Sequence, residues 1–121
     1  MYLILFVLHN PERLDDVITA WNDTGVGGIT ILPSTGLARL KSKGVWRDDF
    51  PILPSLDDFH DYLERLNRTL FTIVENDDMV DRVVQATEKV IGDLRKPNTG
   101  ILSVLPISRV YGLNRFIDDE A

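Results

Sequence analysis

The chain opens with a continuous apolar run, Tyr2 to Leu8, in which both alternating sets of side chains are hydrophobic. Such a run is typical of a strand that is buried on both faces. Pro106 lies within a later apolar segment, and because proline cannot donate to a ladder, we expect that segment to be an edge strand. The predicted strands are 2–8, 29–32 (ended by Pro33), 68–75 and 100–107, and we expect residues 110–113 to add a short one.

Two segments with helical periodicity separate these strands. Asn10 and Pro11 predict the start of the first helix, as N-cap and first helical residue, and Gly25 predicts a left-handed C-cap. Asn76 or Asp77 predicts the N-cap of the second helix. The apolar stripes are Leu14, Val17, Ile18 and Trp21 in the first helix, and Val80, Val83, Val84, Thr87, Val90, Ile91 and Leu94 in the second.

This order of elements predicts one α+β domain over residues 1–121, a ferredoxin-like βαββαβ sandwich. In that arrangement the first and third strands are central and both helices pack on one face of the sheet. The opposite face keeps apolar side chains, because neither side of the first strand is polar. We therefore expect self-association in a closed oligomer to cover it.

Two stretches stand apart from these elements. Residues 40–66 form a long insertion between predicted strands, which is usually functional or mobile, and the spacing predicts a short helix from Ser55 to Leu66. Residues 114–121 are a tail with acidic residues near its end, and we expect it to fray.

The composition narrows the functional classes. The chain has 19 acidic and 13 basic residues and a formal charge of −6, which argues against nucleic acid as a partner. It has no cysteine, which excludes disulfides, thiolate catalysis and zinc–sulfur sites. The apolar run at the N-terminus is short and has no basic leader, so we expect a cytoplasmic protein.

Two turns are candidate anion-binding elements. The first, Thr35 to Arg39, combines exposed backbone amides at a glycine turn with a guanidinium. The second, Asn98 to Gly100, offers a hydroxyl and backbone amides just before the last strand. Each is also consistent with an ordinary connecting turn. In a cyclic oligomer the two turns would meet across a subunit boundary.

No catalytic arrangement stands out, so we expect a protein that is not an enzyme. An alternative is a small ferredoxin-like enzyme or metal-binding protein that uses His60 and the neighbouring acids Asp57, Asp61 and Glu64; a solvated polar helix face explains these residues without a metal. Trp21 is expected in the core, whereas Trp46 beside Arg47 is expected to contact a partner. A third alternative is a trimeric scaffold without a ligand, whose loop helix binds a protein groove through Leu56, Phe59 and Leu63.

Several short motifs occur in a fixed order along nearly the whole chain except residues 41–66. They are Leu14-Asp15-Asp16-Val17, Gly28-Ile29-Thr30-Ile31, Thr35-Gly36-Leu37-Ala38-Arg39, Thr72 to Asp81, Thr99 to Val104 and Ser108-Arg109-Val110. Together these motifs resemble those of the PII signalling proteins. In that family a glycine-rich turn leads into a long mobile loop, the T-loop.

The resemblance implies a homotrimer with ligand clefts between subunits, an adenine-type nucleotide as effector, and a loop that docks onto a membrane transporter or an enzyme. The ligand-binding positions that it implies are Thr30, Gly36, Leu37, Ala38, Arg39, Thr99 and Gly100. Trp46, Arg47 and Phe59 lie in the corresponding loop and are the expected partner-binding residues.

The chain departs from the family pattern at cationic positions. Ile101 stands where the family carries a phosphate-binding lysine, and Gly112 and Asn114 stand where it carries two arginines. Charge-assisted hydrogen bonds supply much of the affinity for a triphosphate, so these departures predict weaker triphosphate binding. The absence of tyrosine from residues 40–55 predicts that the loop is not nucleotidylated on tyrosine.

Overall fold

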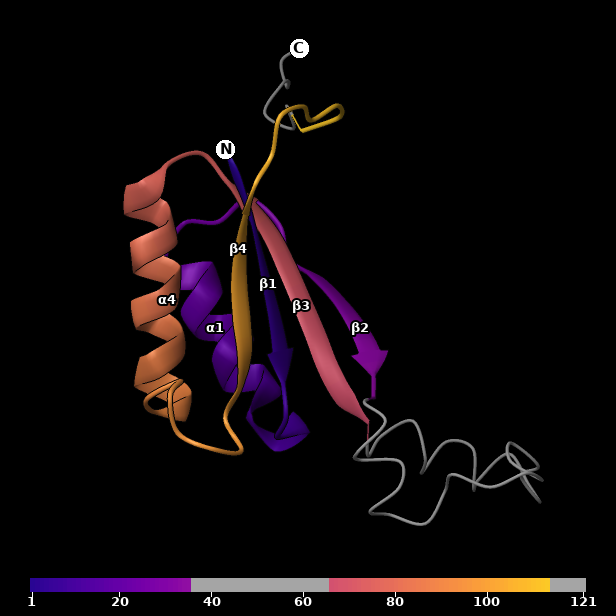
Figure 1. Ribbon diagram of the computed structural model, residues 1–121, viewed down its shortest axis with the longest axis vertical. Helices are drawn as coiled ribbons and strands as arrows, with labels where there is room; N and C mark the ends of the chain where they lie inside the picture. Colours follow the sequence, from indigo (N-terminus) through magenta and orange to yellow (C-terminus); the bar gives the residue numbers. More distant parts are fainter. Residues whose placement is uncertain (36–65, 114–121) are drawn as a thin grey trace, which may run out of the picture.

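The computed structural model describes residues 1–35 and 66–113. It shows an α+β fold in which a four-stranded antiparallel sheet carries two α-helices on one face (Figure 1). The elements are β1 (Tyr2–Leu8), the 3-10 helix η1 (Pro11–Arg13), α1 (Leu14–Asp23), β2 (Thr30–Ser34), β3 (Asn67–Val74), α4 (Asp77–Ile91) and β4 (Gly100–Pro106). No helix in these two ranges is long and apolar enough to cross a membrane.

The strand order is β2-β3-β1-β4, so the prediction that the first and third strands are central is confirmed. The predicted edge position of the last strand is also confirmed, and its Pro106 pairs with Tyr2 at the end of the ladder. The expectation that Pro33 ends β2 is wrong, because β2 continues through Pro33 to Ser34. Since β2 is the other edge of the sheet, a proline there does not interrupt pairing on both sides.

The predicted strand at 110–113 is absent from the structure, where these residues have no regular secondary structure. The amide of Ile107 donates to the carbonyl of Met1 over 3.0 Å. β1 begins at Tyr2, which pairs with Pro106, so residues 110–113 lie beyond the part of the chain that pairs with β1. Their apolar sequence is therefore not enough to make them a strand.

Both helix starts have the predicted caps. The Asn10 side chain accepts from the amide of Glu12 over 3.1 Å, although the first turn is 3-10 and α1 proper begins at Leu14. The Asn76 side chain accepts from the amide of Met79 over 3.0 Å, so Asn76 is the cap of α4. Gly25 follows α1 with φ +98°, the predicted left-handed conformation.

The core lies between the sheet and the two helices. Ile4, Phe6 and Leu8 form the inner side of β1 and are fully buried. Trp21 is also fully buried, as predicted, and its ring centroid lies 6.4 Å from that of Phe6. The other buried apolar residues of the core are Val17, Val26, Leu70, Val74 and Val83.

One buried polar contact joins the two helices. The indole Nε1 of Trp21 donates to the hydroxyl of Thr87 over 2.8 Å, and that hydroxyl donates to the carbonyl of Val83 over 2.7 Å. Thr87 is fully buried, so the donor of Trp21 has no access to water there. The sequence pattern placed Thr87 in the apolar stripe of the second helix, and in the structure its side chain forms a specific hydrogen bond between α1 and α4.

We expect Thr87→Val to lower the free energy of unfolding by about 2 kcal/mol, because it keeps the side-chain shape and leaves the Trp21 donor buried without a partner. Urea denaturation followed by tryptophan fluorescence measures this change. Thr19→Val, on the exposed face of α1, is the matched control and is expected to change stability by less than about 0.5 kcal/mol. Equal effects of the two variants would contradict the role of this hydrogen bond.

Candidate functional site

The sheet face opposite the helices, called here the outer sheet face, contains no charged side chain among the described strand residues. The pairing of the strands places the outward-facing residues of neighbouring strands side by side, in rows that run across the sheet. These residues are Leu3, Leu5 and Val7 of β1, Thr30, Leu32 and Ser34 of β2, Asn67, Thr69, Phe71 and Ile73 of β3, and Ile101, Ser103 and Leu105 of β4.

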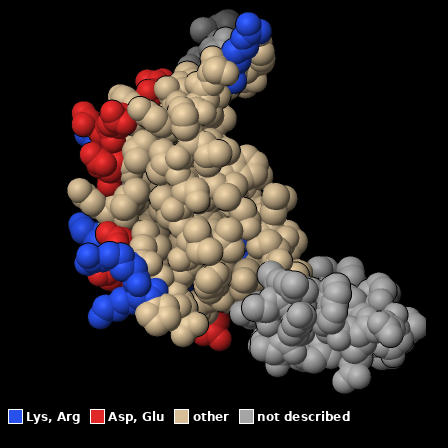
Figure 2. All heavy atoms as spheres, in the orientation of Figure 1, with Lys and Arg blue, Asp and Glu red and all other residues tan. Residues whose placement is uncertain are grey.

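Much of this face is open to solvent in the single chain. Ile101 is 59% exposed, Leu32 is 49% exposed and Leu105 is 45% exposed. Charged side chains gather instead along the helix side of the molecule, and the surface over the strands in Figure 2 carries almost none. An apolar surface of this extent on a chain with 26% charged residues is typical of an interaction site.

The two candidate turns lie at the same end of the sheet but on opposite edges. Gly100 begins β4, and the register runs from it through Leu8 and Arg68 to Pro33 of β2. Three strand spacings separate these edges, about 14 Å. The first turn itself, Gly36 to Arg39, lies outside the described residues. One chain therefore does not bring β4 and the end of β2 into contact.

Thr30 lies away from that end, at the start of the edge strand β2. It pairs with Phe71, which pairs with Leu5. It lines a depression of about 210 Å³ together with Gly27, Gly28, Phe71, Thr72, Ile73 and Leu113. Phe71 and Leu113 were not among the predicted ligand positions. Alternate residues of a strand face the same side, so the sequence could have placed Phe71 on the outer sheet face. Nothing in the sequence places Leu113 beside β2.

The Thr99 hydroxyl, a predicted ligand donor, is used within its own turn. It donates to the carbonyl of Lys96 over 3.0 Å and lies 3.5 Å from the carbonyl of Leu94. Asn98, just before it, has φ +66°, a left-handed conformation that asparagine tolerates. The hydroxyl therefore keeps its lone pairs available, while its proton stabilises the turn.

Gly100 has a structural requirement of its own. Its φ is +143°, which an L side chain rarely adopts, and a Cβ at this position would collide with the backbone carbonyl oxygen of Val7 and lie 2.7 Å from Cε1 of Phe6. The start of β4 therefore fits closely over a core aromatic ring. A ligand is not needed to explain a glycine here.

An exposed ion pair lies in the connection between α4 and β4. Arg95 Nη2 lies 2.9 Å from Asp93 Oδ2. The pKa of Asp93 is lowered below its usual value. The larger cause is the hydrogen bond from the Arg95 guanidinium, and the hydrogen bond from the Arg95 backbone amide adds to it. A lowered pKa means that the pair stabilises the fold above the ordinary aspartate pKa, and that this contribution is lost as the pH falls through the lowered pKa.

We expect Arg95→Gln to raise the pKa of Asp93 toward its ordinary value, because both the charge and the fork of side-chain donors are removed. A carbon-detected NMR titration of the carboxyl group measures the change directly. Lys96→Gln removes a neighbouring exposed cation and serves as the control, with no comparable shift expected. An unchanged Asp93 pKa in Arg95→Gln would show that the pair does not form in solution.

Among the residues that the structure describes, no group of three or more histidine, cysteine, aspartate or glutamate side chains is placed to hold a metal ion. His60 and its acidic neighbours lie outside the described residues, as do Trp46, Arg47 and Phe59. Of the departures from the PII pattern, Ile101 is an exposed apolar side chain on the outer sheet face and Gly112 has φ +88°. Asn114 lies outside the described residues.

A comparison with models of known protein families gives no match, and a comparison with curated proteins gives none either. The geometry defines an α+β protein with an uncharged sheet face.

Proposed function

We propose that the protein is a PII-like signalling protein, a homotrimer of ferredoxin-like subunits that binds a small effector between subunits and regulates a partner protein. The observation that carries this proposal is the outer sheet face, which spans four strands without a charge. Three sheets facing inward would remove from water the exposed Leu32, Ile101 and Leu105, and burial of apolar surface is the main driving force of such association.

The positions of the candidate turns support an effector site at the seam between subunits. The β2 end and Gly100 lie at one end of the sheet on opposite edges. A cyclic assembly that sets the β4 edge of one subunit beside the β2 edge of the next would bring the two turns together. The residues proposed for this site are Thr30, the Gly36 to Arg39 turn, Thr99 and Gly100.

The depression beside Thr30 supports an apolar portion of the ligand. Phe71, Ile73 and Leu113 give it a largely apolar lining, and the Thr30 side chain offers a polar group at its side. A planar base suits such a surface, since ligand sites combine apolar walls with few polar groups. We therefore propose an adenine-type nucleotide, with residues 40–66 as the segment that contacts a membrane transporter or an enzyme.

Calorimetric and thermal-shift titrations with ATP, ADP, AMP, cyclic AMP and cyclic di-AMP test the effector. Ile101 and Gly112 supply no cationic donor for the phosphates of ATP. We therefore expect at least one of ADP, AMP, cyclic AMP and cyclic di-AMP to bind at least as tightly as ATP. Thr30→Val, which keeps the shape of the depression, is expected to weaken binding by roughly fivefold. Absence of binding by every nucleotide at concentrations of about 1 mM would eliminate the nucleotide version of the proposal.

A further inference from the structure

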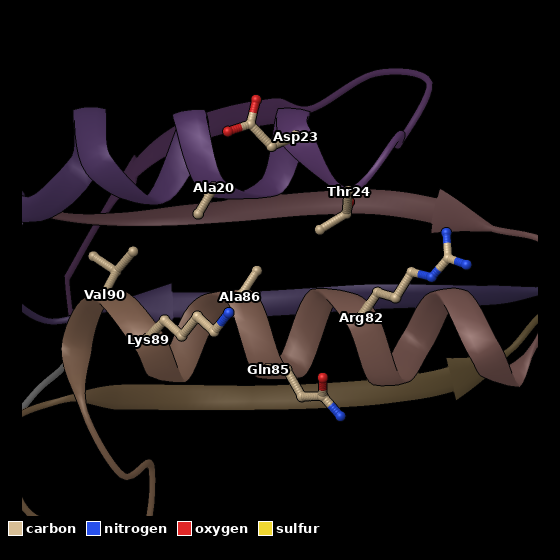
Figure 3. A pocket seen from close by; sticks show the side chains of 8 residues that line it. All are labelled: Ala20, Asp23, Thr24, Arg82, Gln85, Ala86, Lys89 and Val90. Atoms are coloured by element: carbon tan, nitrogen blue, oxygen red, sulfur yellow. The ribbon is translucent and has the colours of Figure 1, made fainter.

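A groove between α1 and α4 lies on the helix side of the molecule, remote from the outer sheet face (Figure 3). Its volume is about 360 Å³. Ala20 of α1 and Ala86 of α4 point toward each other across it, and their short side chains leave the groove open. Along α4 its lining runs from Arg82 to Val90, a rise of about 12 Å. A groove of this form suits a rod-shaped occupant better than a compact one.

Two cations on α4 border the groove without a carboxylate partner. Arg82 and Lys89 are seven residues apart, two helical turns, and so lie on the same face of α4 about 10 Å apart. Ion pairs in the described part of the chain join Arg13 to Asp16 and Arg95 to Asp93, and none involves Arg82 or Lys89.

The nearby acids do not neutralise these cations. Asp78 precedes Arg82 by four residues, the spacing of a helical ion pair, yet within the described ranges no such pair forms. Nη1 of Arg82 instead lies 3.9 Å from Sδ of Met79, one turn earlier on α4. The carboxylate of Asp23 points away from α4 (Figure 3). The open groove therefore presents two positive charges along a floor of alanine methyl groups.

We propose that this groove binds an acidic helical segment of a partner protein. Two carboxylates two turns apart on that segment meet Arg82 and Lys89, and its backbone approaches over Ala20 and Ala86, where small side chains allow close packing. The net charge of −6 opposes an acidic partner elsewhere on the surface, so recognition depends on these two side chains. This inference does not depend on the proposed nucleotide site.

A pair of synthetic helical peptides tests the proposal against the full-length protein. One is alanine-rich with two glutamates seven residues apart, and the other carries glutamine at both positions. Fluorescence anisotropy at about 20 mM ionic strength, where surface charges are weakly screened, measures binding. We expect the glutamate peptide to bind roughly tenfold more tightly, and raising the salt to about 0.5 M to remove the difference.

Variants localise the contact. Arg82→Gln and Lys89→Gln are each expected to weaken glutamate-peptide binding by roughly two- to fivefold, and the double variant by about tenfold. Ala86→Leu, which fills the floor, is expected to weaken it as well, whereas Lys96→Gln, an exposed cation beyond α4, is the matched control and leaves it unchanged.

Several results would overturn the proposal: no peptide binding, equal binding of the two peptides, or an equal loss in Lys96→Gln. Citrate, a compact anion with several carboxylates, is compared with the glutamate peptide. NMR shifts at Arg82 and Lys89 caused by citrate but not by the glutamate peptide would assign the groove to small anions, and the helical-segment proposal would then be wrong.

Discussion

Leu5→Glu is expected to dissociate the proposed trimer into single chains. Leu5 lies on the outer sheet face in β1, one of the two central strands, between Phe71 on one side and Ser103 on the other. In an assembly with inward-facing sheets, the new carboxylate would be buried without a cation, because the described residues of this face carry no charge. An uncompensated buried charge weakens association by about 3 kcal/mol or more, over a hundredfold.

Analytical ultracentrifugation combined with circular dichroism measures the effect. The side chain of Leu5 is only partly buried in the single chain, so the variant subunit is expected to keep its helices and strands. Thr19→Glu introduces the same charge on the exposed face of α1 and is expected to stay trimeric. A monomeric or dimeric wild-type protein would contradict the proposed trimer, and a trimeric Leu5→Glu protein would show that the outer sheet face is not the interface.

The same variant separates self-association from effector binding. Thr30 lies in the row of Leu5, and the two candidate turns lie on opposite edges of one chain. If the effector site requires two subunits, nucleotide affinity falls together with the oligomer. If the monomeric variant retains full affinity, the site is contained within one chain and the seam between subunits is not part of it.

The secondary structure was predictable because its signals are local. Asn10 and Asn76 cap the helices through contacts a few residues away, and the buried faces of β1 and α4 follow the periods of 2 and 3.6. The order of the strands in the sheet could also be predicted, because the βαββαβ pattern permits few arrangements.

The errors arose where the outcome depends on distant neighbours. Pro33 remains within β2 because β2 is an edge strand, and residues 110–113 lie beyond Pro106, where the pairing of β4 with β1 ends. The depression beside Thr30 depends on the return of Leu113 toward β2 and β3, and the α1/α4 groove depends on how two helices pack. These contacts join residues far apart in the sequence, and no period or cap encodes them.

Gly100 is the position where fold and function are easiest to confuse. The resemblance to PII proteins implies a ligand role, whereas the structure shows a glycine with φ +143° over the ring of Phe6. We expect Gly100→Ala to lower the free energy of unfolding by about 3 kcal/mol, because it adds backbone strain and overpacks the new methyl group against the Val7 carbonyl and the buried ring of Phe6. Loss of nucleotide binding in this variant would therefore not by itself identify a ligand contact.

Urea denaturation measures the free energy of unfolding of Gly100→Ala, and Gly28→Ala is the control. At Gly28 no atom lies within 4 Å of an added Cβ, and its φ lies outside the left-handed region, so the stability is expected to change by less than about 0.5 kcal/mol. Equal stability of the two variants would show that the close fit between Gly100 and Phe6 is absent in solution. A destabilised but folded Gly100→Ala protein that retains nucleotide affinity would instead assign this glycine to the fold alone, and the effector site would then depend on the remaining residues of the two turns.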